Sequence, residues 1–161
     1  IENLILAMSI IMADAKLHLS VYGEGEPEYH QQLVQLVKEQ GLAEQIDFIG
    51  HVTEEDKTKA FFNADVCVVP SFTENFGMVV AESLAHGVPV VASKGSPWQG
   101  LEEKNCGSWV DNSPQALAIA IKAISTRELE EMGLNGRRWM QDDFAWSQVA
   151  SRMCSLYYEL V

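Results

Sequence analysis

Basic residues are scarce in this chain. Lysine and arginine together number 11, against 23 aspartates and glutamates, and the formal net charge is -12 at pH 7. Binding to the phosphate backbone of nucleic acid requires a basic face, so the composition excludes nucleic acid as the main partner. A small phosphate ligand stays compatible with an acidic chain, because a few backbone amides are enough to hold it.

Cysteine is also scarce, and long apolar runs are missing. The three cysteines are odd in number and widely spaced, which excludes a disulfide framework and a cysteine-based metal site. We therefore expect a reducing compartment, the cytoplasm. The run LILAMSIIMADA (4–15) follows no basic segment and is too short to span a bilayer, so we predict a buried helix there. Membrane contact has no support in this acidic sequence.

Short apolar segments alternate with segments of helical period along the 161 residues, which are enough for one domain, 1–161, with a full core. Strands are expected at residues 17–22, 46–50, 65–70, 88–93 and 107–110, and helices at 1–13, 27–40, 53–63, 77–86, 113–124, 127–141 and 146–160. Strands that are apolar throughout are typical of a parallel sheet buried on both faces. The sequence therefore predicts an α/β fold, a Rossmann-like doubly wound parallel sheet with helices on both faces.

Three details refine this prediction. The chain begins at Ile1 with a helix, whereas such domains usually begin with a central strand, so we expect the first strand to be missing. Thr53, followed three residues later by Asp56, is predicted to begin a helix with a capping box. We expect the last three helices to form a packing layer.

One stretch, PSFTENFGMVVAESLAHGVPVVAS (70–93), carries two glutamates eight positions apart, Glu74 and Glu82. Ligands of open parallel sheets bind beyond the carboxyl ends of the strands, and Glu74 lies in a loop at such an end. The first amides of the following helix suit a phosphate or a sugar hydroxyl, and Gly77 lets a ligand approach them closely. Carboxylates only accept hydrogen bonds, so Glu74 suits sugar hydroxyls and Glu82 suits the paired hydroxyls of a ribose.

The plainer interpretation makes both glutamates solvated surface residues, with Glu82 favoured by the helix dipole. The neighbours of Glu82 argue against it, because they are apolar: Val79, Val80, Ala81, Leu84 and Ala85. A charge among such residues is rarely buried without a partner. Elsewhere we expect His86 to cap a helix, and Trp98 and Cys67 to lie in the core.

The glutamate stretch closely resembles the nucleotide-binding segment of retaining GT-B glycosyltransferases, especially glycosyltransferase family 4. That family's pattern is Glu, seven residues, Glu, with Phe-Gly after the first glutamate and a G-x-P-V-V-A strand after the helix. Further segments also resemble the family: FIGHVTEED (48–56), ADVCVVPS (64–71), GSPWQGLEEKNCGSWV (95–110) and MGLNGRRWMQDDFAWSQVA (132–150). The resemblance covers residues 1–160 and implies the C-terminal, donor-binding half of a GT-B fold.

The resemblance implies transfer of a sugar from a UDP- or GDP-linked donor to an acceptor hydroxyl, with retained configuration and with no metal or other cofactor. Similar sequences serve the assembly of cell-surface polysaccharides. The resemblance also implies a role for each site residue. Glu74, the candidate catalytic residue, contacts the transferred sugar near its 3- and 4-hydroxyls, and Glu82 binds the ribose. The backbone at His51 and Val52 faces the base, and the sugar and the diphosphate meet the amides of Asn75, Phe76, Gly77, Met78 and Val79.

The chain departs from the family where the family's diphosphate-binding cations should be. An arginine and a lysine in a segment like GRLxxxKG are absent here, and so is the N-terminal acceptor-binding domain. Lys94 is the nearest candidate cation, and we expect it in a solvated loop. Because a leaving diphosphate needs such cations, we expect the chain alone to be inactive and to require an acceptor-binding domain or chain as its partner. Residues 143–161 are expected to form the helix that crosses back to that domain.

Other functions stay open at this point. VYGEGEPEY (21–29) has the G-x-G of a dinucleotide-binding oxidoreductase, but Glu28 stands where the third glycine belongs. A nucleotide-sugar epimerase or a phosphorylase shares the GT-B fold. The chain is also compatible with a donor-binding subunit of a two-chain enzyme. The sequence names neither the base nor the sugar of the donor.

Overall fold

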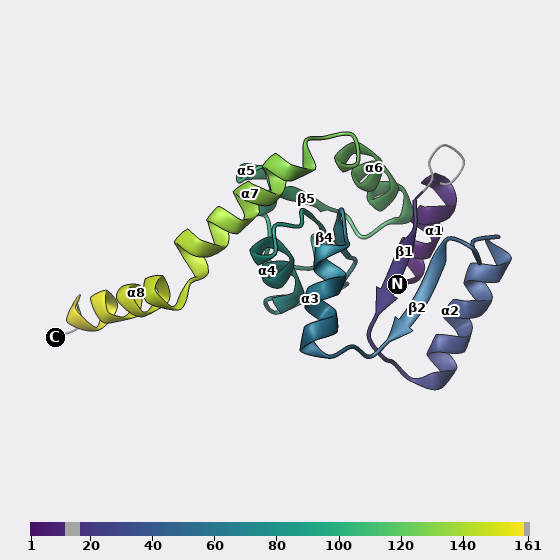
Figure 1. The fold of residues 1–161 in the computed structure, drawn as a ribbon, viewed down its shortest axis with the longest axis horizontal. Helices are drawn as coiled ribbons and strands as arrows, with labels where there is room; N and C mark the ends of the chain where they lie inside the picture. The colour runs from purple at the N-terminus through teal and green to yellow at the C-terminus, as the bar shows by residue number, and fades with distance from the viewer. Residues whose placement is uncertain (12–16, 160–161) are drawn as a thin grey trace.

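The computed structural model describes residues 1–11 and 17–159 (Figure 1). Its strands are β1 (Leu19–Tyr22), β2 (Ile46–Gly50), β3 (Cys67–Val69), β4 (Val90–Ser93) and β5 (Gly107–Val110). Its helices are α1 (Glu2–Ile11), α2 (Pro27–Glu39), α3 (Glu54–Phe62), α4 (Met78–Ala85), α5 (Gly100–Glu103), α6 (Pro114–Ile124), α7 (Leu129–Trp139), the π-helix η1 (Met140–Phe144) and α8 (Trp146–Glu159). The predicted alternation of strands and helices is confirmed, and the single turn α5 and the π-helix are additions to it.

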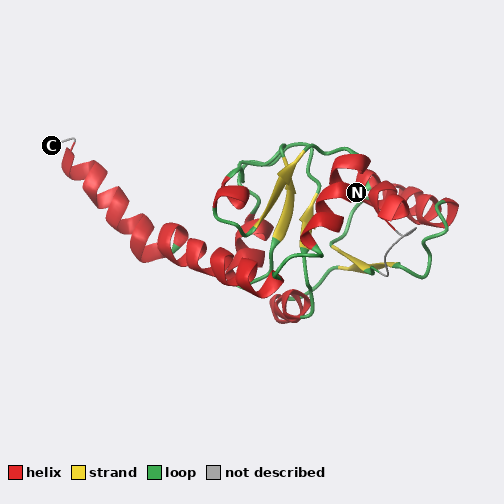
Figure 2. Ribbon diagram, turned by 90° about the horizontal axis from the view of Figure 1, so that it is seen from above, coloured by secondary structure: helices red, strands yellow, loops and turns green. Residues whose placement is uncertain are grey.

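All of the strand pairs are parallel, and the strands form two hydrogen-bonded groups (Figure 2). In the first group β1 pairs with β2, with a register shift after Val21. In the second group β4 lies between β3 and β5. Among the described strands β1 does not pair with β3, so the sheet that we predicted as one is present in two parts.

The central strand β4 shows why the fold needs helices on both of its faces. Val91 belongs to a core cluster that contains side chains of α1 and α6, whereas Val90 and Ala92 belong to a second cluster that contains side chains of α4 and α5. All three side chains are fully buried. Because successive strand residues point to opposite faces, helices cover β4 on both sides, and the predicted doubly wound arrangement is confirmed.

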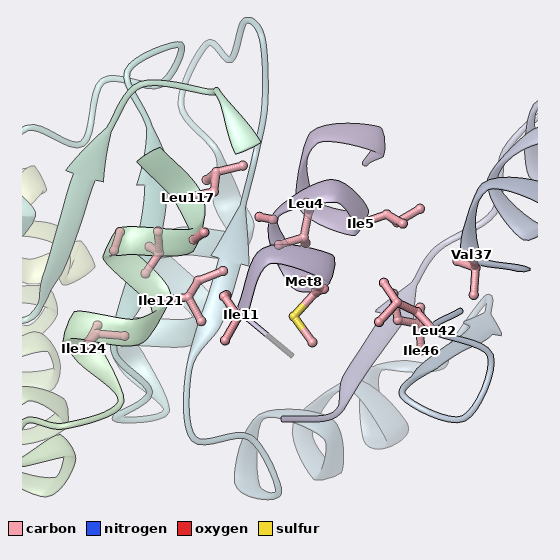
Figure 3. Close-up of a cluster of buried hydrophobic side chains, with 14 of the residues drawn as sticks. Leu4, Ile5, Met8, Ile11, Val37, Leu42, Ile46, Leu117, Ile121 and Ile124 are labelled. Carbon is pink, nitrogen blue, oxygen red and sulfur yellow. The ribbon is translucent and has the colours of Figure 1, made fainter. Parts of the chain in front are cut away.

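Helix α1 forms the centre of the larger core cluster (Figure 3). Leu4 and Ile11 lie toward α6, and Ile5 lies toward Val37 of α2 and Ile46 of β2. An apolar helix buried on more than one side is what the sequence predicted for this segment, although residues 12–15 of the predicted run lie outside the described part. Within residues 1–11 and 17–159, no helix is both long and apolar enough to cross a membrane.

The last three helices differ in how they pack. Helices α6 and α7 bury side chains in the core, and Met140 at the start of η1 is also buried. Helix α8 extends away from the strands and buries none of its described side chains (Figures 1 and 2). Our prediction of a packing layer is therefore wrong for α8, because its apolar residues have no described surface to pack against. The crossover assigned to 143–161 stays a prediction, and residues 160–161 lie outside the described part.

Candidate functional site

The residues singled out from the sequence lie on two loops and one helix. His51 and Val52 follow β2, residues Glu74, Asn75, Phe76 and Gly77 precede α4, and Met78, Val79 and Glu82 lie on α4. In α/β proteins the loops that follow parallel strands form the ligand-binding edge of the sheet. The structure therefore places every predicted site residue at the end of a strand or in the helix that follows it.

The loop between β3 and α4, residues 70–77, is held by the ends of the neighbouring strands. The hydroxyl of Ser93, at the end of β4, donates to the carbonyl of Ser71. The amide of Glu74 donates to the carbonyl of Gly95 over 2.8 Å. These contacts reach the loop from residues distant in sequence, so the backbone beside Glu74 is fixed by the fold rather than by local turn chemistry.

Two further contacts fix the path of this loop. The amide group of Asn112 donates to the carbonyl of Pro70 over 3.0 Å. A Cβ atom at Gly95 would lie 2.3 Å from the carbonyl oxygen of Phe72, far inside van der Waals contact. Only glycine allows the two backbone segments to approach this closely, so Gly95 belongs to the construction of the site.

Gly77 makes the turn from this loop into α4. It is the N-cap residue, with φ of 80° and ψ of 67°, a left-handed conformation that favours glycine. A Cβ atom there would lie 3.0 Å from Cγ of Glu74 and 3.3 Å from Nε1 of Trp98. The amide of Val80 bonds to the carbonyl of Gly77 over 2.9 Å, so the amides before it precede the first helical hydrogen bond. Glu74 and these amides therefore lie side by side at the positive end of α4.

An aromatic cluster around Trp98 packs against the loop that precedes α4. The indole of Trp98, which is 2% exposed, donates to the carbonyl of Phe76. The ring of Trp98 lies 5.1 Å from that of Phe76, 5.5 Å from that of Trp139 and 5.5 Å from that of Phe144. Trp98 is a core residue, as predicted, and it also joins the site loop to α7 and η1.

The start of α4 leaves several of its predicted binding residues accessible. Asn75, Phe76, Met78 and Val79 are exposed, and Met78 has 63% of its surface free. Glu74 is half-buried. Gly77 itself is buried, so the surface open to a ligand is formed by the residues on either side of it. Within residues 1–11 and 17–159 no group of three or more His, Cys, Asp or Glu side chains could hold a metal ion.

Glu82 has the partner that its apolar surroundings require, and this partner is Lys57. The ammonium of Lys57, on α3, lies 2.8 Å from Oε1 of Glu82 and 3.0 Å from Oε1 of Glu54. The side chains of Lys57 and Glu82 are 28% and 30% exposed. Hydrogen bonds to Glu82, and then to Glu54, raise the pKa of Lys57. The sequence analysis missed Lys57, although the need of Glu82 for a cation was a signal that pointed to one.

The turn with His51 and Val52 lies one residue before α3. Thr53 caps this helix as predicted, because its side chain accepts a hydrogen bond from the amide of Asp56 over 3.2 Å. His51 is exposed and Val52 is half-buried. A shallow open hollow borders the turn at Gly50, and it is lined by Gly23, Glu24, Gly25, Pro27, His30, Gln31, Phe48, Ile49 and Gly50. The turn directly precedes α3, the helix that carries Lys57.

Two other predictions can be checked against the geometry. Lys94 is 49% exposed and pairs with Asp111 over 3.5 Å, in agreement with a solvated position. His86 ends α4, and its Nδ1 lies 2.7 Å from the carbonyl oxygen of Glu82. Its role as a helix cap is therefore confirmed.

Comparison with known proteins decides the family. The profile described as "Glycosyl transferases group 1" matches residues 1–139. The chain belongs to this glycosyltransferase family. The resemblance to the donor-binding half of GT-B enzymes is thereby confirmed, and the narrower assignment to family 4 stays a prediction.

Individual relatives of this glycosyltransferase domain agree with the profile. Mannosylfructose-phosphate synthase of Agrobacterium fabrum is 38% identical over 89% of this chain and 33% of its own length. GDP-mannose-dependent alpha-(1-6)-phosphatidylinositol dimannoside mannosyltransferase of Mycobacterium tuberculosis is 32% identical over 67% of this chain and 28% of its own length. The structure of sucrose-phosphate synthase from Thermosynechococcus elongatus matches 99% of this chain and 42% of that chain, with a TM-score of 0.78 and 31% identity.

The glycosyltransferase domain corresponds to only part of each protein that it matches. It spans between 28% and 42% of the length of the three proteins just named. Proteins named as glycosyltransferases or sugar-phosphate synthases make up this set, so the oxidoreductase and epimerase alternatives are not favoured.

Proposed function

We propose that this domain binds the nucleotide-sugar donor of a retaining glycosyltransferase. The observation that carries the proposal is the construction around Gly77. A half-buried carboxylate, Glu74, and the free amides at the start of α4 lie next to each other on a loop that the strand ends hold in place. A sugar diphosphate presents both partners that this arrangement suits, hydroxyls for the carboxylate and phosphate oxygens for the amides.

Each site residue receives one role in this proposal. Glu74 contacts the transferred sugar near its 3- and 4-hydroxyls and is the candidate catalytic residue. The amides of Asn75, Phe76, Gly77, Met78 and Val79 meet the sugar and the diphosphate, the carboxylate of Glu82 accepts the two ribose hydroxyls, and the backbone at His51 and Val52 faces the base. The pairing of Glu82 with Lys57 supports this assignment, because it keeps a charged carboxylate in place on an otherwise apolar helix.

The reaction is the transfer of a sugar from a UDP- or GDP-linked donor to an acceptor hydroxyl, with retained configuration and without a metal. The positive end of α4 stabilises part of the charge that develops on the leaving diphosphate. A relative named as GDP-mannose-dependent and the family itself support this class of donor.

An acceptor-binding domain or chain completes the enzyme in this proposal. The relatives are between two and four times as long as the part that this domain matches, which leaves room in them for a second domain. We expect the domain alone to lack transferase activity, since the acceptor and the cations for the diphosphate come from elsewhere. The three free cysteines support the cytoplasm as the compartment.

Titration with nucleoside diphosphates tests the proposal. UDP, GDP and ADP are added separately at millimolar concentration, and the backbone amide NMR shifts of the domain are followed. One nucleotide should shift the amides of 76–82 and 51–53, and Glu82→Ala should abolish these shifts. A matched control is Glu102→Ala, which removes an exposed carboxylate on α5. If no nucleotide and no nucleotide-sugar shifts these amides, the proposal is wrong.

A further inference from the structure

Lys57 is the cation that bridges α3 and α4 beside the proposed ribose site. Its ammonium contacts Oε1 of Glu82 at 2.8 Å, and both side chains are about two-thirds buried, being 28% and 30% exposed. Lys59, on the same helix, is 60% exposed and pairs within that helix, with Glu55 at 2.9 Å and Asp56 at 3.3 Å. The two lysines therefore differ in what they connect, since one joins two helices and the other stabilises one.

The Lys57–Glu82 contact leaves the carboxylate usable by a ligand. A carboxylate has two oxygens and about four positions for hydrogen-bond donors, and the contact with Lys57 uses Oε1. Oε2 takes no part in this contact and has the chemistry to accept from a hydroxyl. A lysine donates as a point charge, whereas an arginine in its place would pair with both oxygens at once. The lysine thus fixes the carboxylate without covering it.

The same contact ties the carboxylate to the turn proposed for the base. Lys57 lies one helical turn after Thr53, whose side chain caps α3 directly after His51 and Val52. Glu82 lies about one turn into α4, and α4 itself begins directly after the loop that contains Glu74. The Lys57–Glu82 ion pair therefore joins the two helices that follow the loops proposed to contact the nucleotide-sugar.

We propose that Lys57 is a positioning residue for nucleotide binding, which holds the carboxylate of Glu82 in the orientation that accepts both ribose hydroxyls. This inference rests on the proposed function of Glu82. A carboxylate that is already held in place loses little side-chain entropy when two adjacent hydroxyls bind to it. Without Lys57, the Glu82 side chain would have to be immobilised on binding, which weakens the affinity. Lys57 itself acts through Glu82 and need not touch the ligand.

The ribose hydroxyls provide a readout that a merely structural role would not change. We expect the unsubstituted domain to bind UDP or GDP about tenfold more tightly than the 2′-deoxy form, the scale of one hydrogen bond to a charged group. Lys57→Met should remove most of this preference, and so should Glu82→Gln. The matched control Lys59→Met should keep it. Calorimetric titration with UDP, 2′-deoxy-UDP, GDP and 2′-deoxy-GDP gives the four affinities for each variant.

The double variant Lys57→Met, Glu82→Gln provides a second measurement. Because Lys57 acts through Glu82, the double variant should bind UDP or GDP no more weakly than Glu82→Gln alone. If Lys57→Met keeps the full preference for the ribose form, or weakens the two forms equally, the inference is wrong while the proposed function stands. If the unsubstituted domain binds no nucleotide, or if Glu82→Gln has no effect on the preference, the proposed role of Glu82 fails and the inference fails with it.

Discussion

Replacing Gly77 by alanine tests how the site loop is built. Gly77 has a φ of 80°, and an added Cβ would lie 3.0 Å from Cγ of Glu74 and 3.3 Å from Nε1 of Trp98. Gly41 provides the matched control, because it has a φ of 68° and an added Cβ there would meet no atom within 4 Å. The two substitutions share the backbone strain and differ in the crowding of Glu74 and Trp98.

The backbone strain and the crowding each have an expected effect on the free energy of unfolding. A left-handed conformation costs a residue with a Cβ about 1–2 kcal/mol, so both variants should lose that much free energy of unfolding. At Gly77 the Glu74 side chain must also leave its preferred rotamer, which adds about 0.5–1.5 kcal/mol. For a domain of this size each kcal/mol lowers Tm by about 2–4 °C. Gly77→Ala should therefore melt a few degrees below Gly41→Ala.

Binding separates the two variants more sharply than stability does. Gly77→Ala should weaken binding of UDP-glucose or GDP-mannose, because it displaces Glu74 and the amides at the start of α4. Gly41→Ala should leave that binding unchanged, since Gly41 follows α2 and lies away from the loop. Thermal unfolding and calorimetric titration measure the two effects. Equal Tm values together with equal donor affinities would refute our account of the loop.

Three further predictions concern the core, a helix cap and the thiols. Leu4→Ala should reduce the free energy of unfolding by about 2–5 kcal/mol, because Leu4 is 3% exposed in the cluster around α1; denaturant unfolding measures this, and a loss under 1 kcal/mol would contradict it. Thr53→Ala should cost about 0.5–2 kcal/mol by the same assay and should be rescued by Ser, since both hydroxyls can cap α3. Burial raises the pKa of Cys67 to about 11 and that of Cys106 to about 12, so both thiols stay protonated at pH 8. Before unfolding, a thiol reagent should therefore modify the exposed Cys154 alone, and fast reaction of a second thiol would contradict this.

The sequence predicted those parts of the fold that depend on local patterns. Strand β2 has the predicted bounds, 46–50, because an apolar run with a following capping box leaves little freedom in register. Helix α5 was missed because its four residues are too short to show a helical period. The π-helix η1 was also missed, since it depends on the packing of Trp139 and Phe144 against Trp98, which are far apart in the sequence.

The acidic residues of the proposed site come from the sequence, whereas its basic residue comes from the structure. Glu74 and Glu82 could be found because their spacing around Gly77 forms a recognisable pattern within one loop and helix. Lys57 could not be found in this way, because it precedes Glu82 by 25 positions and no short motif relates them. The search for a cation concerned the diphosphate and considered Lys94, whereas the cation that contacts Glu82 lies inside helix α3.

The C-terminal segment supports the proposed site from the side of α7 and η1, where the ring of Phe144 lies 5.8 Å from that of Phe76. Arg137, on α7, donates to the carbonyls of Ala85 and His86 over 3.2 Å each, and so holds the carboxyl end of α4. Trp98, packed on Trp139 of the same helix, holds the carbonyl of Phe76 just before the amino end of α4. Helix α4 has only eight residues, so fixing both of its ends fixes the amides at its start and the carboxylate of Glu82 as one rigid unit. The segment 132–144 therefore determines the geometry of the proposed donor site, although none of its residues is assigned to it.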